Sequence, residues 1–301
     1  MELQMNPKSP GAKFIQLVKE SDPLIITGVI NAYTALLAKQ AKISAIYLSG
    51  AGVANADFGL PDLGMTSLTD VVTQVARITA VSDLPLLVDG DTGWGGELNV
   101  ARTVQQLLRA GAAGVHFEDQ AWPKRCGQRD GKQLIPQADM AAKITAAVAA
   151  RAELELTTGG SPEFVIMART DALGVESEAS ALARAQSYVV AGADMIFAEA
   201  VTELEQYQRF VAAVPGIPVL ANITEFGKTP LFTAQELATV GIKMMLFPLS
   251  AWRAMNKAAL EVFQTIQKQG SQQACIGQMQ TRAELYDLIH YAEFERKISH
   301  E

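Results

Sequence analysis

The chain has 301 residues, of which 49% are hydrophobic and 19% charged, and its formal net charge is −7 at pH 7. No segment approaches the ~20 consecutive apolar residues of a membrane-spanning helix, and the one dense group of cations, residues 124–129, is too short to follow a nucleic-acid backbone. The chain starts without a secretory signal and contains two cysteines, so we expect a cytoplasmic protein without disulfides, nucleic-acid partner or membrane contact.

Short β-rich runs alternate with segments of helical periodicity along the whole chain. The predicted strands span residues 24–27, 45–49, 85–89, 113–118, 164–169, 195–199, 218–222 and 244–248. Helical spacing is clearest in residues 32–42, 67–81, 98–110, 179–191 and 203–213, and a long helix is predicted over about 250–269.

This alternation predicts a single (β/α)8 TIM-type barrel over residues 1–301. Strands joined through helices run parallel, and eight of them close without leaving an edge. An N-terminal helix precedes the barrel, and residues 250–301 form a C-terminal helical extension. The alternative is an open doubly wound sheet, but the chain shows no G-x-G-x-x-G after its first strand.

Carboxylates gather where the predicted strands end, the position at which barrel enzymes place their chemistry. Asp89 and Asp91 lie two residues apart and therefore point the same way, Glu118 ends the next strand, and Asp62 follows the second. The donors are all oxygen, which favours Mg2+ or Mn2+ over zinc. The alternative is that Asp91 caps a helix and the others are solvated.

Residues 119–132 form a polar connection that is long for a barrel, and we expect it to be an active-site lid. Cys126 lies in it among Lys124, Arg125 and Arg129, whose charges should bring the thiol pKa toward neutrality. The cluster of cations could also bind an anionic metabolite, or the segment could be an ordinary solvent-exposed loop. For His116, within the fourth strand, a core position and a site role are both open.

Several segments identify a family. Residues 47–52 (YLSGAG), 89–95 (DGDTGWG) and 124–127 (KRCG) resemble the isocitrate lyase and phosphoenolpyruvate mutase superfamily. Within it, residues 59–64, 166–172, 222–227, 248–256 and 279–286 resemble the 2-methylisocitrate lyase family. The resemblance spans nearly the whole chain, but Gln128 stands where the family lid usually has histidine.

The resemblance implies cleavage of the C2–C3 bond of 2-methylisocitrate to pyruvate and succinate, a step of the methylcitrate cycle in propionate catabolism. It implies Mg2+ at Asp89 and Asp91, with Asp62 and Glu118 helping through water, and Cys126 as the catalytic acid. Tyr47 or a metal-associated carboxylate is the candidate base. The implied substrate-binding residues are Ser49, Gly50, Ala51, Gly127, Arg169, Glu199, Asn222, Thr224, Arg253 and Arg282.

The resemblance also implies a homotetramer that exchanges C-terminal helices between subunits and a small tricarboxylate as the substrate. The alternatives are a related lyase acting on isocitrate or dimethylmalate, an oxaloacetate- or phosphonate-type enzyme of the superfamily, and a non-catalytic protein. The last would leave the set of carboxylates unexplained.

Overall fold

The computed structural model describes residues 9–158 and 163–298, and in it eight parallel strands form a closed barrel. The strands are β1 Leu24–Gly28, β2 Ala45–Leu48, β3 Leu86–Asp89, β4 Gly114–Glu118, β5 Val165–Thr170, β6 Met195–Ala198, β7 Val219–Asn222 and β8 Met244–Phe247. Because β1 pairs with both β2 and β8, the sheet has no free edge, which excludes the open sheet. The predicted strands all form, and their ends differ from the observed ones by at most one residue.

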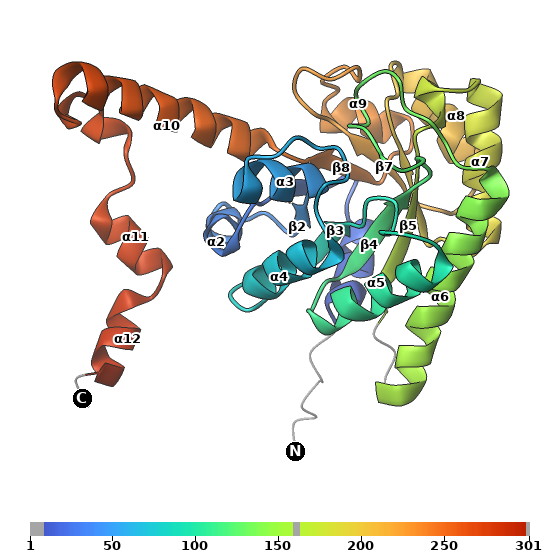
Figure 1. Cartoon of the computed structure of the whole chain (residues 1–301), viewed down its shortest axis with the longest axis horizontal. Helices are drawn as coiled ribbons and strands as arrows, with labels where there is room; N and C mark the ends of the chain where they lie inside the picture. Colours follow the sequence, from blue (N-terminus) through green and yellow to red (C-terminus); the bar gives the residue numbers. More distant parts are fainter. Residues whose placement is uncertain (1–8, 159–162, 299–301) are drawn as a thin grey trace.

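Helices surround the barrel and extend beyond it (Figure 1). They are α1 Pro10–Glu20, α2 Ala32–Gln40, α3 Gly50–Phe58, α4 Leu68–Thr79, α5 Glu97–Arg109, α6 Gln137–Thr158, α7 Glu178–Val190, α8 Leu204–Ala213, α9 Ala234–Thr239, α10 Ser250–Gln269, α11 Arg282–Leu288 and α12 Tyr291–Ile298, with 3-10 turns η1 Ala172–Gly174 and η2 Gln273–Gln278. Helix α4 shows the local logic: Ser67 and Asp70 cap its start reciprocally, and Val71, Val75 and Ile78 form its buried face.

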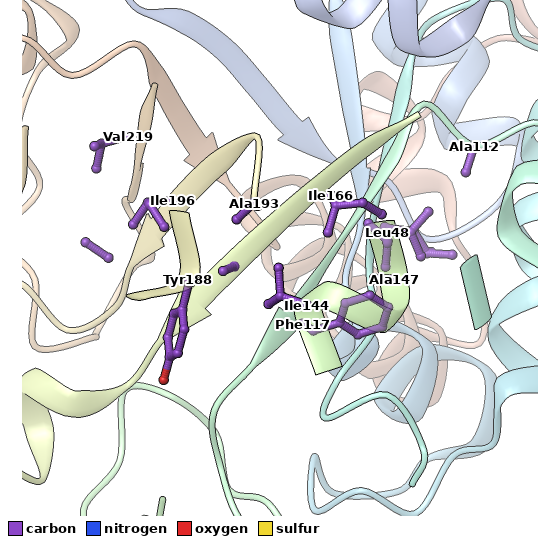
Figure 2. Close-up of a cluster of buried hydrophobic side chains, with 14 of the residues drawn as sticks. Leu48, Ala112, Phe117, Ile144, Ala147, Ile166, Tyr188, Ala193, Ile196 and Val219 are labelled. Atoms are coloured by element: carbon purple, nitrogen blue, oxygen red, sulfur yellow. The ribbon is translucent and has the colours of Figure 1, made fainter. Parts of the chain in front are cut away.

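Successive side chains on each strand face opposite ways. One set, which includes Phe117, Ile166 and Ile196, packs outward against the helices (Figure 2). The other set, which includes Leu87 and Met167, fills the barrel interior.

Helix α1 closes the N-terminal end of the barrel. Its Phe14 and Val18 belong to the interior cluster and are at most 2% exposed. A Cβ on Gly11 would lie 1.6 Å from the Glu163 carbonyl oxygen, so only glycine lets this helix lie so close to the start of β5.

Helices α10, α11 and α12 extend away from the barrel (Figure 1). No residue of α10 is buried, and its apolar side chains Leu260 and Phe263 are 51% and 69% exposed. In the described part of the chain, no helix is both long and apolar enough to cross a membrane.

Candidate active site

The inward-facing positions of the strands carry apolar side chains within the barrel. At the C-terminal ends of the strands, the same positions carry polar side chains. Asp89 lies two residues beyond Leu87, and Arg169 lies two beyond Met167, so both point inward. Other predicted site residues at inward positions of this kind are Tyr47, Ser49, Glu118, Glu199 and Asn222.

A cavity of about 300 Å³ lies at this end of the barrel. The predicted site residues that line it are Tyr47, Ser49, Ala51, Asp62, Asp89, Cys126, Gly127, Arg169, Glu199, Asn222, Thr224 and Arg253. Gly50, Asp91 and Glu118 do not line the cavity but contact residues that do. The structure therefore brings together 15 of the 16 predicted residues.

Arg282 is the predicted residue that the structure does not bring to this cavity. It is exposed at the start of α11, a helix whose main contacts with other helices and strands of its own chain are with α2 and α12. Tyr33 of α2 donates a hydrogen bond of 2.6 Å to Gln280 just before it. Within one chain, Arg282 therefore does not line this cavity.

The two aspartates after β3 share their surroundings with a buried lysine that the sequence did not assign to them. Lys124 lies 2.7 Å from Asp91 Oδ1 and also forms an ion pair with Asp62. Asp89 accepts a 2.9 Å hydrogen bond from the N–H of Gly50, which engages that backbone donor. Asp91 has a left-handed backbone with φ 46°, a strained geometry of the kind found at functional sites.

Burial and mutual repulsion disturb both aspartates. Burial, together with the charges of Asp89 and Asp62, outweighs Lys124 and raises the pKa of Asp91 to about 6. Burial also opposes ionisation of Asp89, but the combined influence of His116 and the nearby cations holds its pKa below its usual value. Asp89 is therefore ionised at neutral pH, whereas Asp91 gives up its proton less readily than an ordinary aspartate.

Among the described residues, no three His, Cys, Asp or Glu side chains are grouped as a ready-made metal site. The donor chemistry nonetheless suits a hard cation. Glu118 is 1% exposed, and its Oε1 has no hydrogen-bond partner. The buried carboxylates at this end, which are Asp89, Asp91, Glu118, Asp119, Asp171 and Glu199, outnumber the buried cations Lys124, Lys132, Arg169 and Arg184.

Arg169 is held by a carboxylate that the sequence did not assign to the site. Its Nε and Nη2 donate to the two oxygens of Asp171 at 2.9 and 3.1 Å, a bidentate pair. Glu118 Oε2 lies 3.3 Å from the same Nε. A Cβ on Gly127 would lie 2.0 Å from Arg169 Nη2, so the backbone of this segment packs directly on the guanidinium.

The expected acidic shift of Cys126 is wrong. Burial, with the charges of Asp62 and Glu199, raises the pKa of this thiol despite the opposing influence of Arg169. The neighbouring cations give little help, because Lys124 is paired with carboxylates and Arg125 is exposed. At neutral pH Cys126 is a thiol, the form that can donate a proton.

His116 is more than a core residue. It is fully buried, and its Nε2 lies 2.8 Å from the Tyr47 hydroxyl oxygen and 3.7 Å from Asp89 Oδ1. Burial lowers the pKa of His116 to about 4 and raises that of Tyr47 well above its usual value. A neutral imidazole therefore contacts a protonated phenol. The sequence could have indicated that His116 faces the site, because it lies two residues before Glu118 on the same strand and so points the same way.

Gln128 connects the segment 119–132 to two other segments. Its amide nitrogen donates to Glu199 Oε1, and its Oε1 accepts a 2.7 Å hydrogen bond from the N–H of Lys228. The side chains of Lys228 and Asp130 form an ion pair beside it. Residues of this segment, including Gln128, thus form part of the cavity lining.

A model of the phosphoenolpyruvate phosphomutase family matches residues 14–267. The chain belongs to this family. Within the family it is 53% identical to the 2-methylisocitrate lyase of Vibrio cholerae, over 99% of this chain and 96% of that protein.

Solved structures of the phosphoenolpyruvate phosphomutase family share the fold over nearly their whole length. A crystal structure of 2,3-dimethylmalate lyase, a member of the phosphoenolpyruvate mutase and isocitrate lyase superfamily, superposes with a TM-score of 0.88 at 30% identity, covering 97% of this chain and 95% of the other. A phosphonopyruvate hydrolase bound to oxalate and Mg2+ gives 0.82 at 25% identity, covering 95% and 97%.

Proposed function

We propose that this protein is a carbon–carbon lyase that cleaves 2-methylisocitrate between C2 and C3 to give pyruvate and succinate. The observation that carries the proposal is the placement of the protonated Cys126 and the buried Arg169 on one cavity with an apolar wall. The similarity to curated 2-methylisocitrate lyases over the whole chain supports the same reaction.

We propose that Mg2+, with Mn2+ as the alternative, is held by Asp89 and Asp91, while Asp62 and Glu118 contribute through water. The excess of buried carboxylates and the unpartnered Glu118 Oε1 support a divalent cation here. A phosphonopyruvate hydrolase with this fold was solved with Mg2+. Held by these residues, the ion would supply Lewis-acid polarisation of the substrate's 2-hydroxyl group.

Arg169 lies where it can bind a substrate carboxylate, because Asp171 fixes the plane of its guanidinium. Arg253 lines the cavity from α10, and Thr224 and the α3 N-terminus at Ser49 and Ala51 add polar donors. The Asn222 amide nitrogen donates to Glu199 at 3.0 Å, which orients that carboxylate over the cavity.

The reaction needs one proton removed and one delivered. Loss of the 2-hydroxyl proton lets the C2–C3 bond break, so that C2 becomes the pyruvate carbonyl and the electron pair stays on C3. The Cys126 thiol then delivers its proton to C3, completing succinate and leaving a thiolate. The Tyr47 hydroxyl, which is hydrogen-bonded to His116, is the candidate base that removes the first proton. A carboxylate at the proposed metal site is the alternative base.

Three apolar side chains support 2-methylisocitrate as the substrate. Phe197, Leu246 and Pro248 line the cavity. A methyl group buried among them is worth about 1–3 kcal/mol, or roughly 10–200-fold in kcat/KM over isocitrate.

The test is to incubate the purified protein and Mg2+ with 2-methylisocitrate, isocitrate and 2,3-dimethylmalate and to identify the products by NMR. We expect pyruvate and succinate from 2-methylisocitrate at the highest kcat/KM. Glyoxylate from isocitrate at an equal or higher rate would place the chain in a different branch of the family. Turnover of dimethylmalate alone would contradict the substrate.

We further propose that residues 119–132 act as a lid over this site and that the protein is a cytoplasmic homotetramer. The exposed apolar side chains of α10–α12 support exchange of these helices between subunits, which could bring Arg282 of another subunit to the cavity. Light scattering on the full chain should give four times the mass of 32.3 kDa. A monomer, or a tetramer unaffected by charge substitutions at Leu260 and Phe263, would contradict this arrangement.

A further inference from the structure

A buried lysine outside the cavity ties the lid to the arginine beneath it. Lys132 is 5% exposed. Its Nζ donates to the Gly127 carbonyl oxygen at 2.6 Å and to Asp171 Oδ1 at 2.8 Å. It does not line the cavity, so it cannot touch a substrate there.

The two residues that Lys132 holds both contact Arg169, which lines the cavity. Gly127 follows Cys126, and its backbone packs so closely on Arg169 that a Cβ would lie 2.0 Å from Nη2. Asp171 is the bidentate partner of the same guanidinium. One ammonium group therefore sets the position of the lid backbone beside Cys126 and of the carboxylate that orients Arg169.

Asp171 also connects the two ends of the lid. Its N–H donates to Asp119 Oδ1 at 2.9 Å, where the lid begins, and its carboxylate accepts from Lys132, where the lid ends. The Arg169 and Lys132 charges overcome burial and lower the pKa of Asp171 to about 2, so this acceptor is ionised at any working pH.

A purely stabilising role explains this arrangement poorly. Taking an ammonium group out of water has a large desolvation cost, which its attraction to one carboxylate seldom returns, so a buried ion pair is weak evidence of stability. The two acceptors of Lys132 are the lid backbone and the partner of Arg169, and both belong to the site.

We propose that Lys132 is a positioning residue: it holds Gly127, and with it Cys126, against the Arg169–Asp171 pair in the closed state of the lid. The proposal rests on the proposed lyase function for its kinetic consequence. Its structural consequence, the accessibility of Cys126, can be measured without any substrate.

The test variant is Lys132→Met, which keeps the length of the side chain and removes its donors. Arg151→Met is the matched control. Arg151 also bridges a carbonyl, that of Phe164 at 2.8 Å, and a carboxylate, that of Asp194 at 2.5 Å, but at the opposite end of the barrel. Both variants lose the same kind of contact, so Tm should fall in both. Only Lys132→Met should change the accessibility of Cys126 and the catalytic rate.

The first measurement is the rate at which iodoacetamide alkylates Cys126, followed by peptide mass spectrometry on full-length protein without substrate. In Lys132→Met we expect a rise of about tenfold or more, the size of effect expected from losing a hydrogen bond to a charged group. Lys132→Arg, which keeps the cation, should return the rate toward wild type. Arg151→Met should leave it unchanged.

The second measurement is steady-state kinetics on 2-methylisocitrate, where Lys132→Met should lower kcat by about tenfold or more while changing KM less. If Lys132→Met does not fold, Lys132→Gln replaces it in both measurements. Unchanged alkylation in the Lys132 variant, or equal changes in the Arg151 variant, would overturn the proposal. The remaining outcome is that the wild-type protein cleaves none of the tricarboxylates while Cys126 is still alkylated faster in Lys132→Met than in the wild type. That result would support the positioning role and reject the proposed substrate.

Discussion

The barrel interior differs between its two ends. At the N-terminal end, Phe14 and Val18 of α1 pack on apolar strand residues such as Leu24 and Met244. At the C-terminal end, the strand ends and the segments that follow them bring together six buried carboxylates and four buried cations. Apolar burial stabilises by about 25 cal/mol per Å², whereas buried ion pairs often contribute nothing. One end therefore supplies stability, and the other holds an arrangement that only binding or catalysis explains.

Of the substitutions considered, Asp89→Ala should have the largest effect on activity, because it changes the polar end of the barrel. The change removes one of the two proposed metal-holding carboxylates and the acceptor of the Gly50 N–H, so activity should fall to background. Adding Mg2+ should raise Tm in the wild type and not in the variant. If Mg2+ still raises Tm in the variant, the ion binds elsewhere.

Cys126→Ser should lower kcat by about 10²–10⁴-fold, because a serine hydroxyl of much higher pKa is a poor proton donor. Substrate affinity, measured by calorimetry, should stay close to wild type since the two side chains are nearly isosteric. Turnover above about a tenth of wild type would rule out Cys126 as the acid.

Phe14→Ala probes the other end of the barrel. The side chain is fully buried, so its loss should lower the free energy of unfolding by about 3–5 kcal/mol. At a temperature where the variant remains folded, its kcat should equal that of the wild type. A fall in kcat as large as that of Cys126→Ser would show that the two ends are not independent.

Short-range patterns predicted the barrel and the carboxylates at the strand ends, whereas the proposed substrate-binding residues came from the family resemblance. Alternation of apolar residues fixed the inward face of each strand, and Asp89, Glu118 and Arg169 follow that alternation. The predicted strand ends agree with the structure to within one residue for the same reason.

What the sequence could not show are pairings between distant segments. Lys124 was grouped with Cys126 by proximity in the chain, but in space its charge is taken up by Asp62 and Asp91. The pKa of Cys126 therefore rises where local charges suggested a fall. The contact between His116 and Tyr47 likewise joins residues 69 positions apart.

Leu246→Phe should narrow the apolar wall of the cavity, because the larger ring takes the volume proposed for the substrate methyl group. We expect kcat/KM for 2-methylisocitrate to fall by about tenfold more than the value for isocitrate. Equal losses for both substrates would mean that Leu246 packs at the mouth without contacting the methyl group.

Gln128→His should have the smallest effect, and only at acid pH. In the wild type the amide donates to Glu199 and accepts from the N–H of Lys228, roles that no change of pH alters. A neutral imidazole can fill both roles, since one nitrogen donates and the other accepts. An imidazolium donates from both nitrogens and cannot accept from Lys228. Its ordinary pKa is about 6.5, and the Glu199 carboxylate should raise that value by favouring the charged form.

The Gln128→His variant should therefore match the wild type at alkaline pH and lose activity as pH falls through this raised pKa. The measurement is the ratio of variant to wild-type kcat/KM from about pH 5.5 to 8.5, which cancels every titration that the two proteins share. Gln128→Leu is the control, because it loses both hydrogen bonds at every pH and should give a low, flat ratio. A flat ratio for histidine as well would mean that the Lys228 contact does not hold the lid, and a ratio that rises toward acid pH would mean that the imidazolium assists Cys126 instead.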